Sequence, residues 1–158
     1  MNSSEFVSNF IFLGSSITKC NISNDFTFYD EKENYQKNLS VSHHIDSIEF
    51  LEDKEAILGI ITLNIKNTFS KDDQNVSFDV SMQGGFAMDE QKDNTNLDTF
   101  REYLTVNGLT TLYSLLRGFI SSTSSQIFQT GKILLPMFNI AQYSKESSEN
   151  SPNNNSNA

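Results

Sequence analysis

Apolar and polar residues alternate along residues 75–88, and this pattern constrains the fold more than any other feature of the sequence. On one parity lie Val76, Phe78, Val80, Met82, Phe86 and Met88. A period of two over this length predicts a β-strand with one buried and one solvent-facing side. The pair Gly84-Gly85 interrupts the run, which predicts a kink, a bulge or a close backbone approach there.

A second alternating run precedes the first one. Its apolar parity over residues 56–69 contains Ile57, Ile61, Leu63, Ile65 and Phe69. Leu58 and Ile60 make its first half apolar on both sides, as expected of a strand that is covered on each face. The short polar linker 70–74 predicts a hairpin between the two strands.

Two further strands are expected upstream. Residues 39–50 alternate, with a change of parity across Asp46-Ser47 that predicts a bulge or bend in one long strand. Residues 10–22 form a weaker strand candidate, and residues 24–34 look like a loop that contains Phe and Tyr. The first 88 residues therefore predict four strands.

Helical spacing replaces the alternation after residue 88. Asn96 or Asp98 can cap a short helix that carries Leu97, Phe100 and Leu104 on one face. We expect Asn107-Gly108 to end this helix.

A second helix is expected over residues 109–123, with Gly118 in its middle. Residues 133–140 then form an apolar extended segment that Pro136 bars from a central strand. The whole layout predicts an α+β fold, with a four-stranded antiparallel sheet and two helices packed on one face.

The length of 158 residues suits one domain. We expect a folded domain over residues 1–142 and a disordered Ser- and Asn-rich tail over 143–158, which has almost nothing apolar to bury. The formal net charge of −9 disfavours nucleic acid as a partner, because an acidic surface repels phosphates. It would attract a basic partner, although solubility alone also accounts for it.

Cys20 is the only cysteine, so no intrachain disulfide can form, which fits a reducing compartment. Residues 1–12 lack the basic and long apolar stretches of a signal peptide. No apolar run is long enough to span a membrane. We therefore expect a cytoplasmic protein that does not insert directly into a membrane.

No catalytic arrangement is visible in the sequence. We expect Cys20 to be a small buried hydrophobic residue. His43 and His44 are adjacent, so on a strand they point to opposite faces and cannot chelate one metal together. Gly84-Gly85 lacks the spacing of a phosphate-binding loop. We therefore expect no enzyme activity, no metal and no cofactor.

One run and one late segment stand out from residue 100 onward. They comprise Phe100-Arg101-Glu102-Tyr103-Leu104-Thr105-Val106-Asn107-Gly108, then Leu112, Arg117 and Ile120, and finally Gly131, Leu134, Leu135, Pro136 and Asn139. An Arg followed by Ile on a helix, then a Gly and an L-x-x-P-x-N segment, resembles the SecB family of protein-export chaperones. The strand 76–86, with its Gly pair before Phe86, is similar to the family's last strand. The resemblance covers residues 59–140.

This resemblance implies a protomer that assembles as a homotetramer, a dimer of dimers. Members of the family hold unfolded polypeptides or preproteins in apolar grooves without ATP and deliver them to the SecA translocase. Candidate groove residues are the apolar side chains that the predicted core does not clearly claim: Leu58, Ile60, Phe86, Met88, Phe128, Met137 and Phe138. We expect oligomer contacts at Leu115, Gly118 and Ser122.

The chain departs from the family after residue 143, where the sequence cannot form the family's apolar C-terminal helix. Two other hypotheses stay open. One is a dedicated SecB-like chaperone for a single client such as an antitoxin. The other is a small carrier that encloses an apolar ligand in a cavity between sheet and helix.

Overall fold

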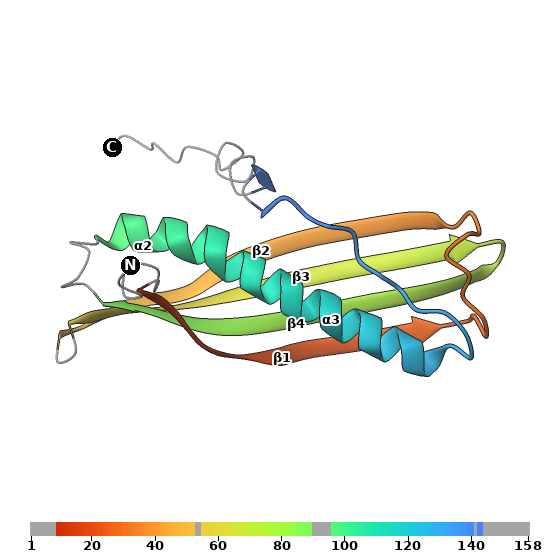
Figure 1. Ribbon diagram of the computed structural model, residues 1–158, viewed down its shortest axis with the longest axis horizontal. Helices are drawn as coiled ribbons and strands as arrows, with labels where there is room; N and C mark the ends of the chain where they lie inside the picture. The colour runs from red at the N-terminus through yellow and green to blue at the C-terminus, as the bar shows by residue number, and fades with distance from the viewer. Residues whose placement is uncertain (1–8, 53–54, 90–95, 141, 144–158) are drawn as a thin grey trace, which may run out of the picture.

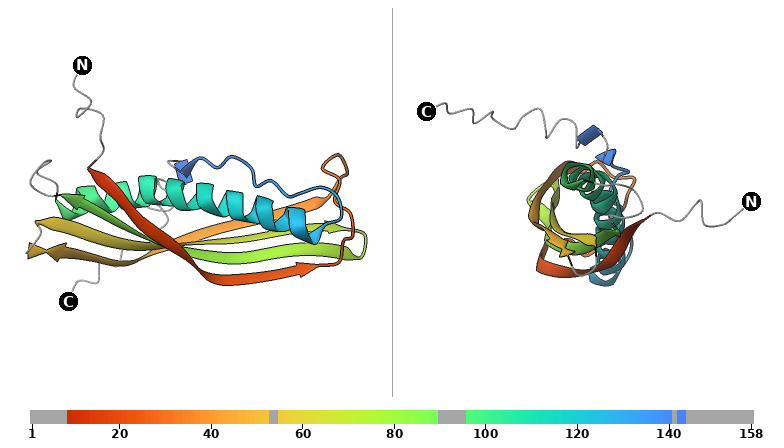
Figure 2. Two further views of the ribbon diagram at one scale, coloured as in Figure 1. Left: turned by 60° about the horizontal axis from the view of Figure 1, so that its bottom comes forward. Right: turned by 90° about the vertical axis from the view of Figure 1, so that its left-hand side faces the viewer.

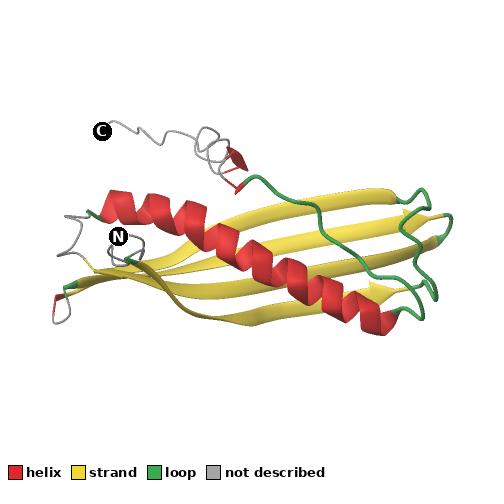
Figure 3. Cartoon of the chain, viewed as in Figure 1, coloured by secondary structure: helices red, strands yellow, loops and turns green. Residues whose placement is uncertain are grey.

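The computed structural model describes residues 9–52, 55–89, 96–140 and 142–143. Four long antiparallel strands form one sheet: β1 (Phe10–Asn24), β2 (Gln36–Leu51), β3 (Ala56–Lys71) and β4 (Gln74–Asp89). Their order across the sheet is β1-β4-β3-β2. A single long helix crosses one face of this sheet diagonally (Figure 1, Figure 3). The predicted four strands, and the hairpin between β3 and β4, are confirmed.

The helix is continuous, so the expectation of two helices was wrong. It consists of α2 (Leu97–Tyr103), a π-helical turn η3 (Leu104–Gly108) and α3 (Leu109–Ile127). Asn96 caps its start as predicted, because the Asn96 Oδ1 accepts from the backbone N–H of Thr99 at 2.8 Å.

Burial against the sheet overrides the Asn-Gly break signal. Among the buried residues of this helix, one row has a residue at every fourth position: Phe100, Leu104, Gly108, Leu112, Leu116 and Ile120. An α-helix has about 3.6 residues per turn, so residues spaced by four shift gradually around the helix axis. The wider π turn takes up part of this shift.

Two strand glycines allow the helix to lie close to the sheet. A Cβ at Gly59 of β3 would lie 2.6 Å from Cε1 of Phe100. A Cβ at Gly84 of β4 would lie 2.6 Å from Cδ2 of Leu112. The close approach predicted at Gly84-Gly85 is therefore made by a helix side chain at Gly84.

The core lies between the helix and the inner face of the sheet, which curves around the helix (Figure 2). Ile57, Ile61, Leu63, Ile65, Phe69, Val76, Phe78, Val80, Met82, Phe86 and Met88 are buried there. The predicted bulge in β2 is confirmed by a register shift between Ile45 and Ser47. Leu58 and Ile60 lie on the opposite face of the sheet and are half-buried.

β1 is an edge strand, and its side chains from Ile11 to Ser23 are all exposed. They include the large apolar residues Ile11, Phe12, Leu13, Ile17 and Ile22. Cys20 lies in the same strand and is exposed, which corrects the expectation of a buried thiol. Within the described part of the chain the strand pairs only with β4, so its outer edge and both of its faces are largely open there.

Candidate functional site

The segment after the helix, residues 128–140, runs back along the molecule as an extended strap (Figure 1). Its first turn is seated on the loop between β1 and β2. The backbone N–H of Tyr29 donates to Thr130 O at 3.1 Å, and the N–H of Gln129 donates to Thr27 O at 3.0 Å. Gly131 has a φ of +84°, and a Cβ there would lie 1.9 Å from Tyr29 O. Only glycine fits this turn.

The strap is fixed to α3 by side-chain hydrogen bonds. Arg117 Nε donates to Leu135 O at 2.7 Å, and the Tyr113 hydroxyl donates to Pro136 O at 2.8 Å. The backbone N–H of Ile133 donates to Ser124 Oγ at 2.8 Å. Burial raises the pKa of Tyr113, which keeps the phenol in its donating form. The expected extended segment therefore exists, outside the sheet and against the helix.

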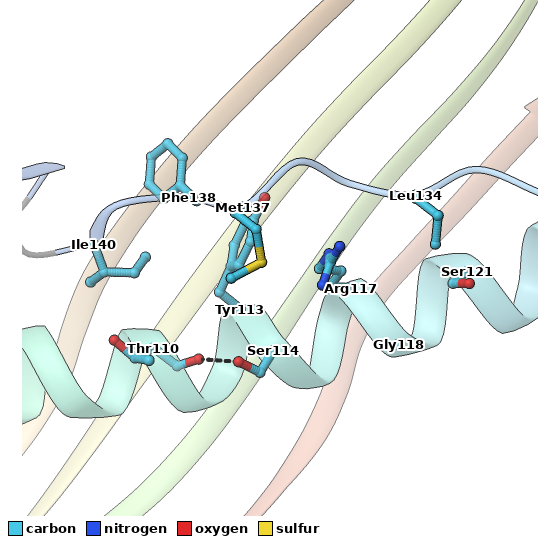
Figure 4. A pocket seen from close by; sticks show the side chains of 10 residues that line it. All are labelled: Thr110, Tyr113, Ser114, Arg117, Gly118, Ser121, Leu134, Met137, Phe138 and Ile140. Atoms are coloured by element: carbon cyan, nitrogen blue, oxygen red, sulfur yellow. Dashed lines mark hydrogen bonds between the residues drawn. The ribbon is translucent and has the colours of Figure 1, made fainter. Parts of the chain in front are cut away.

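A first cavity of about 370 Å³ lies between the strap and α3, and we call it the helix-side cavity (Figure 4). Its lining comprises Thr110, Tyr113, Ser114, Arg117, Gly118, Ser121, Leu134, Met137, Phe138 and Ile140. Met137 is 84% exposed and Leu134 is 47% exposed. Its strap side therefore offers apolar groups to solvent, opposite a helix face with hydroxyl groups and one cation.

A second cavity of about 340 Å³, the sheet-side cavity, lies on the sheet side of the strap. Its lining comprises Tyr29, Glu31, Lys37, Leu39, Asn67, Phe69, Leu134 and Pro136. Leu134 borders both cavities, so concave and largely apolar surfaces flank the strap.

Asn67 is the unusual member of the sheet-side cavity. It is 2% exposed, and its Nδ2 has no hydrogen-bond partner among the described residues. An unpaired buried amide costs about 1–3 kcal/mol of stability. Asn67 was not predicted from the sequence, although a signal was present: it is the polar interruption of the buried parity of β3 between Ile65 and Phe69.

The charges around the sheet-side cavity nearly balance. It holds one cationic side chain, Lys37, and one anionic side chain, Glu31. The Lys37 ammonium lies 5.9 Å from the centroid of the Phe69 ring, within the range of a cation–π contact. Burial, and secondarily the charges of Tyr35 and Glu31, raises the pKa of Tyr29 to about 12. Its phenol therefore stays neutral.

The structure separates the predicted groove residues into three places. Met137 and Phe138 line the helix-side cavity. Phe86, Met88 and Phe128 are at most 5% exposed and belong to the core of the protomer, which corrects their expected surface position. Leu58 and Ile60 lie on the far face of the sheet, because their parity is opposite to that of Ile57.

The three predicted oligomer residues all lie on the exposed side of α3. Leu115 is 41% exposed, and Gly118 and Ser122 are exposed as well. Gly118 also borders the helix-side cavity, so an oligomer contact there would lie beside it.

His43 and His44, the two histidines considered as possible metal ligands, do not line either cavity. His43 contacts Tyr143, whereas His44 Nε2 lies 3.1 Å from Asp46 Oδ1 on the other face of β2. Over the described ranges, no group of three or more His, Cys, Asp or Glu side chains could hold a metal ion. None of the helices described is long and apolar enough to cross a bilayer. Residues 144–158, most of the expected tail, lie outside the described residues.

Comparison with solved structures identifies the architecture. The SecB-like chaperone of Mycobacterium tuberculosis, solved in complex with a peptide from an antitoxin, matches with a TM-score of 0.59 and 10% sequence identity. The match covers 82% of this chain and 90% of that chain. This chain has a SecB-like fold.

A protein of unknown function from Streptococcus agalactiae also matches, with a TM-score of 0.46 and 10% identity over 81% of this chain and 97% of that chain. No protein-family model matches the sequence, and no curated protein does. The SecB-like architecture expected from the resemblance is confirmed, with one helix in place of two.

Proposed function

We propose that this SecB-like protein is an ATP-independent chaperone, without enzyme activity, that holds unfolded or unassembled polypeptides beside the strap. The observation that carries the proposal is the pair of concave, largely apolar surfaces on the two sides of residues 128–140, with Leu134 in both. Unfolded chains expose apolar side chains, and burying them gains about 25 cal/mol per Å². Exposed Met137 suits clients of varied shape, because methionine is flexible and polarizable.

Self-association into the expected homotetramer is part of the proposal. β1 presents an open strand edge and exposed apolar side chains, both of which favour pairing with a neighbour. Monomeric soluble proteins rarely expose large apolar patches to solvent. We propose the cytoplasm as the compartment, because an exposed Cys20 thiol suits reducing conditions. For clients that are exported preproteins, the proposed function includes delivery to the SecA translocase.

A dedicated client is the second candidate function. The similar chaperone of Mycobacterium tuberculosis was solved with a peptide from an antitoxin, which favours a single client such as an antitoxin. A pull-down that returns one basic or aggregation-prone partner would favour this role over general holding. The carrier hypothesis requires an enclosed cavity between sheet and helix, whereas the two cavities beside the strap lie outside that layer.

The test is suppression of aggregation of an unfolded model protein without ATP. Two leucines of similar exposure provide matched variants: Leu134 beside the strap at 47% and Leu97 at the start of the helix at 51%. We expect Leu134→Glu to lose holding activity and Leu97→Glu to keep it. Absence of suppression by the wild type would overturn the general holding function. A mass in solution near four times 17.9 kDa would support the homotetramer.

A further inference from the structure

The other two buried polar side chains of the sheet, Thr62 and Ser81, both have partners. Asn64 Oδ1 accepts from the Ser81 hydroxyl at 2.6 Å on the far face of the sheet. Thr62 Oγ1 donates to Asp46 Oδ2 at 2.7 Å. Asn67, by contrast, lies on the inner face between Leu39 of β2 and Phe78 of β4, and neither side chain can accept a hydrogen bond. A buried amide without a partner calls for an explanation.

The strap above the sheet-side cavity does not supply the missing acceptor. Leu134 and Pro136 line this cavity with apolar side chains. The carbonyl groups of Leu135 and Pro136 already accept from Arg117 and Tyr113 on the helix, so they are turned away from β3. Asn67 Nδ2 thus remains a buried donor next to a cavity, with no acceptor from the described chain.

We propose that Asn67 is a client-binding residue, whose side-chain amide donates to a main-chain carbonyl oxygen of an extended polypeptide bound in the sheet-side cavity. The side chain next to that carbonyl packs against Leu39, Leu134 and Pro136. This inference rests on the proposed holding function and names what the site recognises. A main-chain carbonyl is present in every residue, so the contact anchors a client without selecting its sequence.

The charge of the cavity favours a neutral acceptor over a carboxylate. Lys37 alone would attract an anion, but Glu31 lines the same cavity and offsets that charge. An amide carbonyl needs no counter-ion in order to accept the hydrogen bond from Asn67. The ligand class is therefore a peptide main chain rather than a free carboxylate.

The test uses a short peptide of alternating leucine and serine, capped at both ends so that it carries no charge. In the wild-type protein, the side-chain amide signals of Asn67 should shift downfield in the 15N–1H NMR spectrum when this peptide is added. Asn67→Leu should weaken peptide binding by about 3- to 10-fold, the range of one net hydrogen bond. Asn38→Leu is the matched control, because Asn38 lies on the exposed face of β2 between Lys37 and Leu39.

A second series replaces single peptide amides with esters, whose carbonyl oxygens are weaker acceptors. An ester at one position of the peptide should weaken its binding to the wild-type protein. The same ester should not weaken binding to the Asn67→Leu variant. Hexanoate serves as the carboxylate probe and should leave the Asn67 signals unchanged.

Peptide binding without an Asn67 shift, and with equal affinity in Asn67→Leu, would overturn this inference while the holding function stands. An Asn67 shift caused by hexanoate but not by the peptide would overturn the choice of a main-chain ligand. Absence of peptide binding by a wild type that suppresses aggregation would overturn this inference alone, whereas absence of both would overturn both proposals. The shift is measured on the wild type, so it decides the question even if Asn67→Leu folds poorly.

Discussion

His43 on β2 and Tyr143 beyond the strap meet across 100 positions of sequence, with 3.1 Å between His43 Nδ1 and the phenol oxygen. The two rings lie edge to face with centroids 5.4 Å apart. The Tyr143 hydroxyl also donates to Val41 O at 3.4 Å. This contact attaches the far end of the strap to the edge of the sheet.

The His43 contact predicts a pH dependence of stability. Burial, assisted by the neighbouring His44, lowers the pKa of His43 below its usual 6.5. Between the lowered pKa and 6.5 the unfolded chain binds a proton that the folded chain does not. The free energy of unfolding should therefore fall as the pH drops through 6.5, and this fall should end below the folded pKa. Urea midpoints measured across this range test it.

Two neighbouring histidines provide the variants for that test. His43→Leu should lower stability at every pH and remove this part of the slope. His44→Asn should retain most of the slope, because His44 is exposed on the other face. An unchanged slope in His43→Leu would assign the pH dependence to other groups.

Gly84 and Gly85 should respond in opposite ways to alanine. A Cβ at Gly84 would lie 2.6 Å from Leu112, whereas the nearest atom to one at Gly85 is 3.8 Å away. We expect Gly84→Ala to lower the free energy of unfolding by about 1–3 kcal/mol through overpacking. Gly85→Ala should be neutral or slightly stabilising, because alanine restricts the unfolded chain. Equal effects of the two changes in denaturant titrations would contradict the close helix contact at Gly84.

The hydrogen bonds from α3 should control how often the strap opens. Arg117→Met and Tyr113→Phe each remove one bond to a strap carbonyl, worth about 0.5–1.5 kcal/mol. Trypsin can cut the strap after the exposed Lys132, and both variants should be cut there faster than the wild type. Ser114→Ala is the control, because among the described residues its hydroxyl donates within the helix, to Thr110 O. Equal cutting of all four proteins would show that these bonds do not hold the strap.

Gly118→Ala should affect the stability of the protomer and the assembly of the proposed oligomer differently. No atom of the described chain beyond the helix's own backbone lies within 4 Å of a Cβ at this position. Alanine should therefore raise the stability of the protomer by about 1 kcal/mol through helix propensity. If Gly118 lies in a subunit contact, the same change should shift assembly to higher protein concentration. Thermal melting and mass measurements at two concentrations distinguish the two effects.

The sheet could be predicted from sequence because its signals are local. Alternation located β2, β3 and β4, whereas β1 was only a weaker candidate, and the parity change at Asp46-Ser47 marked the bulge in β2. The helix could not be predicted as one unit in the same way. Asn107-Gly108 is a local break signal, and the row of buried residues that overrides it acts through contacts with the sheet.

The site was predicted only in outline. Pro136 and the apolar run indicated an extended segment, and Met137 and Phe138 do line a cavity beside it. Within the described chain, Asn67 Nδ2 lacks a hydrogen-bond partner because of the direction in which the strap carbonyls point. Tyr113 and Arg117 of α3 orient those carbonyls. Periodicity cannot supply that information.

The exposed β1 strand has a consequence for any measurement on this protein. If copies cover one another along β1, the folded state contains more than one subunit, and mass action then sets its population. Dilution would act as a denaturant, and a melting temperature would have meaning only together with the concentration at which it was recorded. In a cell, the abundance of the protein would itself decide how much of it is in working form.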